Sequence, residues 1–193
     1  MANFNEAYNI TLGHEGSYDN DPDDVGGETY KGVARRYHPD WEGWQIIDSY
    51  KSDSNFPSIL DNDTALQSLI RTFYKQHYWN LFWGDEIPDQ QLANELFDTG
   101  VNMGVGRAVK YLQQGLNLLN RNQKNYPDIA DDGSFGKNTM KALNSYLDID
   151  EVSYLYKIIN ILQGMHYIEY MTKSPTQEKY ARGWLNRVDF IKN

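Results

Sequence analysis

Apolar side chains recur along this chain at the three- and four-residue spacing of amphipathic helices. The first such segment follows Asn3 and ends near Gly13. Its apolar positions are Phe4, Ala7, Tyr8, Ile10 and Leu12. Asn3, with Glu6 three positions later, is typical of a helix N-cap and its capping-box partner. The pattern predicts a helix between Asn3 and Gly13.

Two aspartates mark the starts of further helices in the middle of the chain. Asp63 precedes an apolar stripe at Leu66, Leu69, Ile70, Phe73 and His77. Asp89 precedes a second stripe at Leu92, Leu96, Phe97 and Val101. A glycine-containing break at 102–106 separates this helix from one that carries Ala108, Tyr111, Leu112, Leu116 and Leu119. Three helices are therefore predicted between Asp63 and Leu119.

The C-terminal part also has a helical pattern. Residues 120–132 are polar and form a connector, and the Asp132-Gly133 turn leads into another helix. A long apolar helix is predicted from about Val152 to Tyr170. The segment Ser174-Pro175-Thr176-Gln177 has the pattern of a capping box with proline at the first helical position, which predicts a last helix.

Residues 16–60 lack a sustained period and are rich in Gly, Asp, Pro and aromatic residues. This composition is typical of turns and loops, so we expect a hairpin plus loops there. Helices around one small hairpin indicate a mainly α fold of the α+β class. The connector at 120–132 is short and ordinary, so the parts on either side are expected to pack together.

The composition excludes several classes of function. The net charge is −9 and the pI about 4.8, which disfavours nucleic acid as a partner. Cysteine is absent and the four histidines lie in separate elements, so neither a metal site nor a cofactor is predicted. No window has the roughly 18 apolar residues of a membrane span. Membrane insertion is therefore not expected.

The sequence offers a candidate site for cleaving sugars. Glu15 follows the first predicted helix, Asp24 lies nine positions later in the turn-rich segment, and Thr29 follows five positions after that. Glycosidases need one carboxylic acid that protonates the glycosidic oxygen and a second group across the sugar ring. A helix end next to a hairpin can supply both. The alternative is an ordinary surface loop with solvated carboxylates.

Sequence motifs resemble those of glycoside hydrolase family 108, the bacterial and prophage N-acetylmuramidases, some first named secretion activators. The N-terminal run Glu-Gly-Ser-Tyr at 15–18, with Asp-Val-Gly-Gly-Glu-Thr at 24–29, is similar to the family's Glu-Gly-Gly-Tyr and Asp-Pro-Gly-Gly-x-Thr. The Phe-Asp-Thr-Gly-Val-Asn run at 97–102 and the Gly-Trp-Leu-Asn-Arg-Val run at 183–188 also match. Ser17 and Val25 depart from the family pattern, but neither change removes a carboxylate or hydroxyl.

The resemblance implies a lysozyme-like helical fold with a small hairpin beside the active-site cleft. It implies a catalytic lobe over 1–102 and a helical lobe over 103–193 packed on it. The run from Asp132 to Thr139 resembles the Asp-Gly-x-x-Gly-x-x-Thr turn of peptidoglycan-binding modules. The order of Glu15, Asp24 and Thr29 is also similar to that of the acid, carboxylate and threonine of phage lysozymes.

The activity implied is hydrolysis of the β-1,4 bond between N-acetylmuramic acid and N-acetylglucosamine in peptidoglycan glycan strands. Glu15 would be the general acid, Asp24 would stabilise positive charge or orient water, and Thr29 would hold that water. Aromatic faces stack on sugars, so Tyr18 and Tyr30 are expected to bind substrate, although such rings also fill cores. Asp98 and Asn102, one helical turn apart, are further substrate-binding candidates, or else bond to neighbouring backbone.

Two other functions remain open at this point. A lytic transglycosylase would need only the one acid, and a non-catalytic wall-binding or secretion-assisting protein would need none. The N-terminus lacks a basic flank and apolar core, so no secretory signal is predicted. We therefore expect synthesis in the cytoplasm and action at the cell wall or periplasm after passage through a holin or an export apparatus, as for a prophage endolysin.

Overall fold

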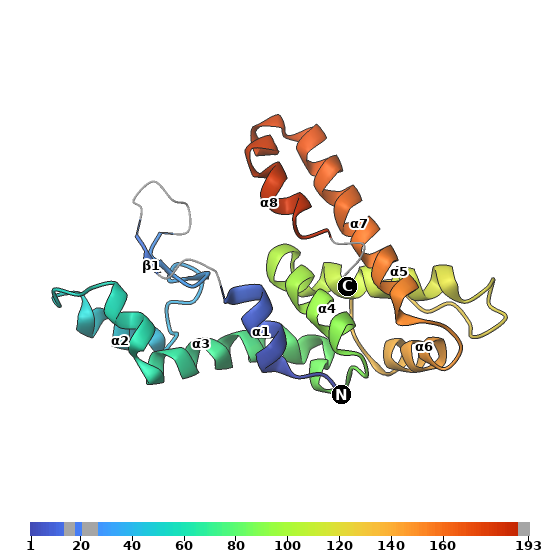
Figure 1. Ribbon diagram of the computed structural model, residues 1–193, viewed down its shortest axis with the longest axis horizontal. Coiled ribbons are helices and arrows are strands. Elements are labelled where there is room, and N and C mark those ends of the chain that lie inside the picture. Colours follow the sequence, from blue (N-terminus) through green and yellow to red (C-terminus); the bar gives the residue numbers. More distant parts are fainter. Residues whose placement is uncertain (14–17, 21–26, 189–193) are drawn as a thin grey trace.

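The computed structural model describes residues 1–13, 18–20 and 27–188. Within these residues helices predominate and one small sheet is present (Figure 1), which confirms the mainly α, lysozyme-like expectation. The α-helices are α1 (Phe4–Leu12), α2 (Gly43–Tyr50), α3 (Thr64–His77), α4 (Gln90–Met103), α5 (Val105–Leu119), α6 (Lys137–Leu147), α7 (Val152–Lys173) and α8 (Ala181–Leu185). Short 3-10 helices are η1 (Ser58–Asn62), η2 (Trp79–Phe82), η3 (Gly84–Glu86) and η4 (Pro175–Tyr180).

The sheet consists of β1 (Tyr18–Asp19), β2 (Thr29–Tyr30) and β3 (Val33–Ala34), antiparallel in the order β1-β2-β3. Lys31 and Gly32 connect β2 to β3 with φ angles of 43° and 81°. Positive φ at both central residues is typical of a tight hairpin turn. The Tyr74 hydroxyl from α3 donates to the Lys31 carbonyl at 2.7 Å. The turn is thereby fixed on α3.

Aromatic rings from α1, α3, η2 and α4 form the core of the N-terminal half. The Phe4 ring lies 5.7 Å from that of Trp79 and 5.8 Å from that of Phe97, edge to face in both cases. Tyr8 contacts Tyr74 in the same manner at 5.9 Å. Edge-to-face packing is a favoured geometry for such rings. These contacts hold α1 on α3 and α4 and so position the end of α1 near the sheet.

Local capping signals account for the starts of three helices. The side chains of Asp63 and Asp89 accept hydrogen bonds from the backbone N–H groups of Leu66 and Leu92, each at 2.8 Å. Asn3 caps α1 by accepting from Asn5. Such caps satisfy N–H groups that have no partner within the helix. The predictions that these residues begin helices are confirmed.

The C-terminal half is built around α5, which packs against α4, α6 and α7. A Cβ atom on Gly115 would lie 2.7 Å from Leu155 of α7, so glycine permits the close approach of the two helices. Gly104, with a φ of 89°, separates α4 from α5. Figure 1 shows α7 and α8 as a helical hairpin that projects away from α5 and α6. The predicted break at 102–106 is confirmed.

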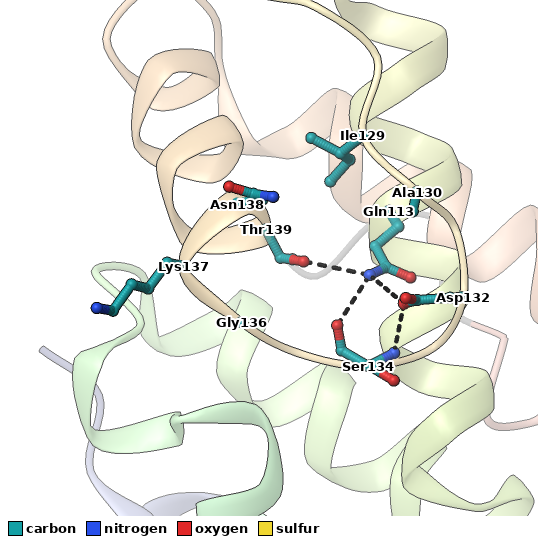
Figure 2. A pocket seen from close by; sticks show the side chains of 9 residues that line it. All are labelled: Gln113, Ile129, Ala130, Asp132, Ser134, Gly136, Lys137, Asn138 and Thr139. Carbon is teal, nitrogen blue, oxygen red and sulfur yellow. Dashed lines mark hydrogen bonds between the residues drawn. The ribbon is translucent and has the colours of Figure 1, made fainter.

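Gln113 of α5 organises the turn that precedes α6 (Figure 2). Its buried side-chain nitrogen donates to Asp132 Oδ1, the Ser134 carbonyl and Thr139 Oγ1, at 3.1–3.2 Å, and its oxygen accepts from the Gly133 N–H at 2.8 Å. Gly133 has a φ of 77°, and a Cβ atom there would lie 2.4 Å from the carbonyl oxygen of Gly106. The aspartate, glycine and threonine of the motif thus fix this turn against α5.

Three details differ from the sequence-based expectation. Residues 16–60 contain α2 and η1 in addition to the hairpin and loops. Ser174 makes no side-chain cap, and the chain after it forms η4 before the short α8. Ile10, expected on the buried face of α1, is 52% exposed. Position 10 lies outside the stripe formed by Phe4, Tyr8 and Leu12, because one helical turn takes 3.6 residues.

Candidate active site

The antiparallel pairing of β1 with β2 places Tyr18 opposite Tyr30 and Asp19 opposite Thr29. Thr29 pairs with Asp19 across one edge of β2 and with Ala34 across the other. The Thr29 residue is half-buried in this central strand. Glu15 and Asp24 lie outside the described residues. Of the three candidate catalytic residues, the structure therefore places Thr29.

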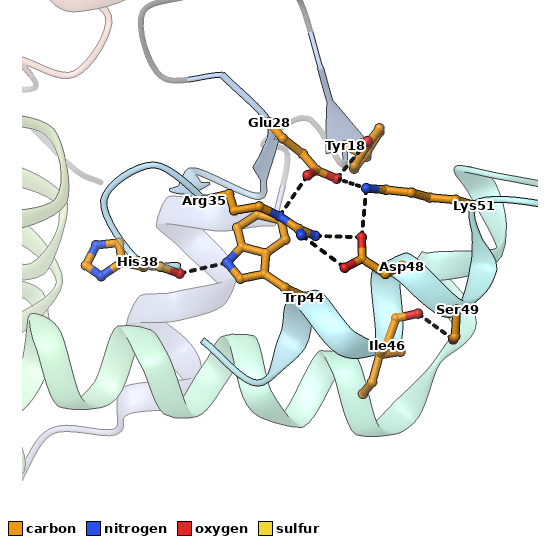
Figure 3. Close-up of polar contacts among 9 residues, drawn as sticks. All are labelled: Tyr18, Glu28, Arg35, His38, Trp44, Ile46, Asp48, Ser49 and Lys51. Carbon is orange, nitrogen blue, oxygen red and sulfur yellow. Dashed lines mark hydrogen bonds and ion pairs between the residues drawn. The ribbon is translucent and has the colours of Figure 1, made fainter. Parts of the chain in front are cut away.

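A largely buried carboxylate next to Thr29 connects the sheet to α2 (Figure 3). The Glu28 side chain is 11% exposed and forms ion pairs with Arg35 Nε at 2.7 Å and Lys51 Nζ at 2.9 Å. The Tyr18 hydroxyl donates to the same carboxylate at 2.9 Å. Burial, and then this hydrogen bond, raise the pKa of Tyr18. Glu28 thus connects β1, the segment after β3 and the C-terminal end of α2.

Asp48 of α2 completes this polar cluster from the other side. The Arg35 guanidinium donates two hydrogen bonds to its carboxylate, at 3.0 and 2.7 Å, and Lys51 Nζ lies 2.7 Å from it. Hydrogen bonds from Arg35 and then Lys51 lower the pKa of Asp48 to about 2. The Arg35 guanidinium also lies 4.5 Å from the Trp44 ring centroid, in cation–π geometry. Sequence reasoning missed this cluster because it did not predict α2.

Tyr18 and Tyr30, both proposed to bind substrate, have different environments. Tyr18 is partly exposed and contacts Phe56 edge to face at 4.7 Å. Tyr30 is fully buried, lies parallel to Trp41 and accepts a hydrogen bond from Gln67 at 2.8 Å. Burial raises the pKa of Tyr30 to about 12. Because no face of its ring is open, the expected stacking of Tyr30 on a sugar is wrong for this structure.

Asp98 and Asn102 lie one turn apart on α4, as expected. The Asn102 amide donates to the Asp98 backbone carbonyl at 2.8 Å. The Asp98 carboxylate accepts a hydrogen bond from Arg187 Nη1 at 2.8 Å, and both side chains are largely buried. This contact joins two of the sequence motifs, the one at 97–102 on α4 and the one at 183–188, which begins on α8. Asp98 therefore has a structural contact, and a role for either residue in substrate binding stays a prediction.

A second buried contact joins α4 to α7. Gln163 Nε2 donates to Thr99 Oγ1 at 3.2 Å, and Thr99 Oγ1 is also 3.3 Å from a carboxylate oxygen of Glu95. All three residues are buried. A polar network in a core favours one arrangement of the helices that carry it. The C-terminal helices are thus fixed on α4, which also packs in the N-terminal half.

A small pocket of about 200 Å³ borders the turn organised by Gln113 (Figure 2). Ile129, Ser134, Lys137 and Asn138 are among its lining residues. Backbone and side-chain hydrogen bonds from Ser134 and then Gln113 lower the pKa of Asp132. Among the described residues, no group of three or more His, Asp or Glu side chains is placed to hold a metal ion. Likewise, none of the helices described is long and apolar enough to span a bilayer.

A helical fold with a small antiparallel sheet beside the end of its first helix defines the lysozyme-like class. Residues 8–104 match the model of the family described as glycosyl hydrolase 108. That match spans half of the chain, and the chain belongs to this family of glycoside hydrolases. Residues 107–189 match the model of a domain described as a predicted peptidoglycan domain, which supports peptidoglycan as a partner.

The structure is similar to that of SagA from Brucella abortus. The TM-score is 0.64 at 21% sequence identity, over 96% of this chain and 88% of SagA. Likeness at this identity shows that the fold is shared along nearly the whole chain. No curated protein matches the sequence.

Proposed function

We propose that this protein hydrolyses the β-1,4 bond between N-acetylmuramic acid and N-acetylglucosamine in peptidoglycan. Glu15 is the general acid that protonates the leaving oxygen. Asp24 stabilises positive charge at the anomeric carbon or orients water, and Thr29 holds that water. Glu15 must remain protonated near neutral pH, which requires a raised pKa.

The match of residues 8–104 to a glycoside hydrolase family is the observation that carries this proposal. The matched range includes Glu15, Asp24 and Thr29. The described residues on either side of Glu15 are Gly13, which ends α1, and Tyr18, which begins β1. The sheet pairs Tyr18 and Asp19 with the strand that carries Thr29.

In this proposal the chain consists of two lobes with different functions, residues 1–102 and residues 103–193. The first carries the catalytic residues and the second binds peptidoglycan. The second matched region begins at Arg107, just after the glycine that separates α4 from α5. Tyr18, Asp98 and Asn102 are proposed substrate contacts of the first lobe. Tyr30 is left out because it is buried.

Mass spectrometry of peptidoglycan fragments tests the proposed reaction. Purified sacculi incubated with the protein should release fragments with reducing muramic acid ends. Anhydro-muramic ends would instead identify a lytic transglycosylase. The absence of fragments, from a protein that sediments with sacculi, would identify a non-catalytic wall-binding protein.

We further propose that a holin or an export apparatus delivers the protein, because its proposed substrate lies outside the cytoplasmic membrane. Cells that express the chain alone should stay intact, with no fall in optical density, and co-expression of a holin should cause lysis. Prompt lysis without the holin, at expression levels where Glu15→Gln is harmless, would contradict this route.

A further inference from the structure

A pocket of about 440 Å³ lies where the junction of α4 and α5 meets α7 and α8, and we call it the α4–α7 pocket. Its volume is within the range of small-molecule sites. Its lining includes Met103, Arg107, His166, Tyr167, Tyr170 and Trp184. The residues come from segments far apart in sequence, because Met103 and Arg107 lie on α4 and α5 and the others lie on α7 and α8. Asn102, proposed above as a substrate contact, also lines it, whereas Glu15, Asp24 and Thr29 are not among its lining residues.

Arg107 gives this pocket a positive charge. Its guanidinium donates from Nη1 to the Met103 carbonyl at 3.1 Å. Among the described residues, no carboxylate forms an ion pair with Arg107, whereas Arg187 nearby pairs with Asp98. A guanidinium has five N–H donors, arranged so that two can bind one carboxylate. Arg107 therefore retains donors for an anionic ligand.

His166 lies in the electrostatic field of Arg107. Burial lowers the pKa of His166, and the charge of Arg107 lowers it further. Glu169 and Lys173, on the same helix, have opposite smaller effects on this pKa. A negative ligand would offset the charge of Arg107 and stabilise a protonated His166. Arg107 and His166 thus both favour a negatively charged ligand.

Flat aromatic rings form the other wall of the pocket. Trp184 lies nearly parallel to Tyr167, with an interplanar angle of 12° and 5.2 Å between centroids. Tyr170 contacts Trp184 at 5.8 Å and is 43% exposed. Stacked rings lose little entropy on binding because they are already held in place. They offer an apolar surface to the aliphatic part of a ligand whose charged end reaches Arg107.

We propose that the α4–α7 pocket binds a carboxylate of the peptide portion of peptidoglycan. Arg107 contacts the carboxylate, and Tyr170 and Trp184 pack against the aliphatic part of the same amino acid. The choice of peptidoglycan as the source rests on the proposed function, and the pocket lies within or next to the region that matches the peptidoglycan domain. The pocket holds the wall and takes no part in breaking the glycosidic bond.

Calorimetric titration with soluble muropeptides tests this site. The probe is the disaccharide with its peptide attached, and the protein carries Glu15→Gln to slow turnover. Adding Arg107→Gln should weaken binding roughly tenfold or more, since a hydrogen-bonded charge is lost. Lys110→Gln removes the same charge from an exposed site on α5 that does not line the pocket, and it should bind as before. Arg107→Lys should restore part of the affinity.

A second probe tests the proposed site without altering the protein, so its result depends neither on the folding of a variant nor on the proposed reaction. The same muropeptide with its peptide carboxylates amidated should bind the Glu15→Gln protein roughly tenfold or more weakly. Equal affinity for the two probes would overturn the inference, as would equal affinity of the Arg107→Gln and Lys110→Gln proteins for the first probe. Failure of the proposed function would appear separately, as missing reducing ends in the fragment analysis.

Discussion

At the residue scale, the proposed chemistry needs one carboxyl group that gives up a proton and one that stays ionised. Thr29, in the middle strand of the sheet, is fixed between Asp19 and Ala34. The sheet thus fixes the backbone from which the Thr29 hydroxyl would orient the water in the proposed reaction. Replacing Glu15 by Gln removes an acidic proton, whereas replacing Asp24 by Asn removes a negative charge. The two proposed roles can therefore be tested independently.

Glu15→Gln keeps the shape of the side chain and removes its acidic proton. We expect the rate of peptidoglycan lysis to fall roughly a hundredfold to ten-thousandfold, with an unchanged melting temperature. The fall in turbidity of a sacculus suspension measures the rate. Glu6→Gln, at an exposed site on α1, is the matched control. A wild-type rate in a correctly folded Glu15→Gln protein would remove Glu15 from the mechanism.

Asp24→Asn tests the charged partner. If Asp24 stabilises charge in the transition state, kcat should fall strongly while KM changes little. Asparagine is as good a turn residue as aspartate, so a purely structural role predicts a near wild-type rate. Kinetics on soluble glycan strands distinguish the two results, with Asp23→Asn as the neighbouring control. A near wild-type rate would favour the transglycosylase reaction.

At the scale of single elements, α2 shows why part of the site escaped prediction. Glu42, at its N-cap position, makes no side-chain cap, so no local signal marks the start of the helix. Its stability comes from contacts distant in sequence, such as those of Asp48 with Arg35. Asp63 and Asp89, in contrast, act within three residues of themselves and were predicted correctly.

The same distinction explains the outcomes for Tyr30 and Ser174. Sequence places Tyr30 in the candidate site, but its burial depends on Trp41 and Gln67, which come from other elements. The segment after Ser174 has a helix-start pattern, and a 3-10 helix forms there instead. Local patterns therefore predicted the helical class and most helix starts, whereas exposure of side chains required the tertiary structure.

Asp48→Asn should change how stability depends on pH. The pKa of Asp48 is about 2 in the folded protein, below the usual value of about 3.9 in an unfolded chain. Its ionised form therefore stabilises the fold above pH 4, and this contribution is lost as the pH falls from about 4 to about 2. The melting temperature of Asp48→Asn should be lower at pH 7 and should fall less over that window. Parallel pH profiles of the two proteins would contradict this role.

At the scale of the whole molecule, α4 joins the two parts of the chain. Its buried face carries Phe97 for the aromatic core, and Asp98 and Thr99 contact the C-terminal helical segment. Side chains with contacts in both halves couple their stabilities. We therefore expect the two matched regions to unfold in one transition.

Arg187→Gln tests whether the ion pair between Asp98 and Arg187 contributes to the stability of the protein. Losing the ion pair with Asp98 should destabilise the protein by on the order of 1 kcal/mol, because both side chains are largely buried. Arg182→Gln, on the exposed side of α8, should have a smaller effect. Denaturant unfolding followed by tryptophan fluorescence measures both. An Arg187→Gln protein as stable as the Arg182→Gln control would show that the ion pair does not contribute.

The Asp98–Arg187 contact also has a consequence during synthesis of the chain. The two residues are 89 positions apart, which a ribosome adding 5–20 residues per second covers in roughly 4–18 s. The nascent α4 lacks Gln163 until 64 residues after Thr99 have been added, and it lacks Arg187 for the full interval. A chain that terminates before Val152, where α7 begins, leaves the face of α4 that meets these two residues permanently open. We infer that such truncated products are recognised by proteases, so that chains whose synthesis was not completed are removed.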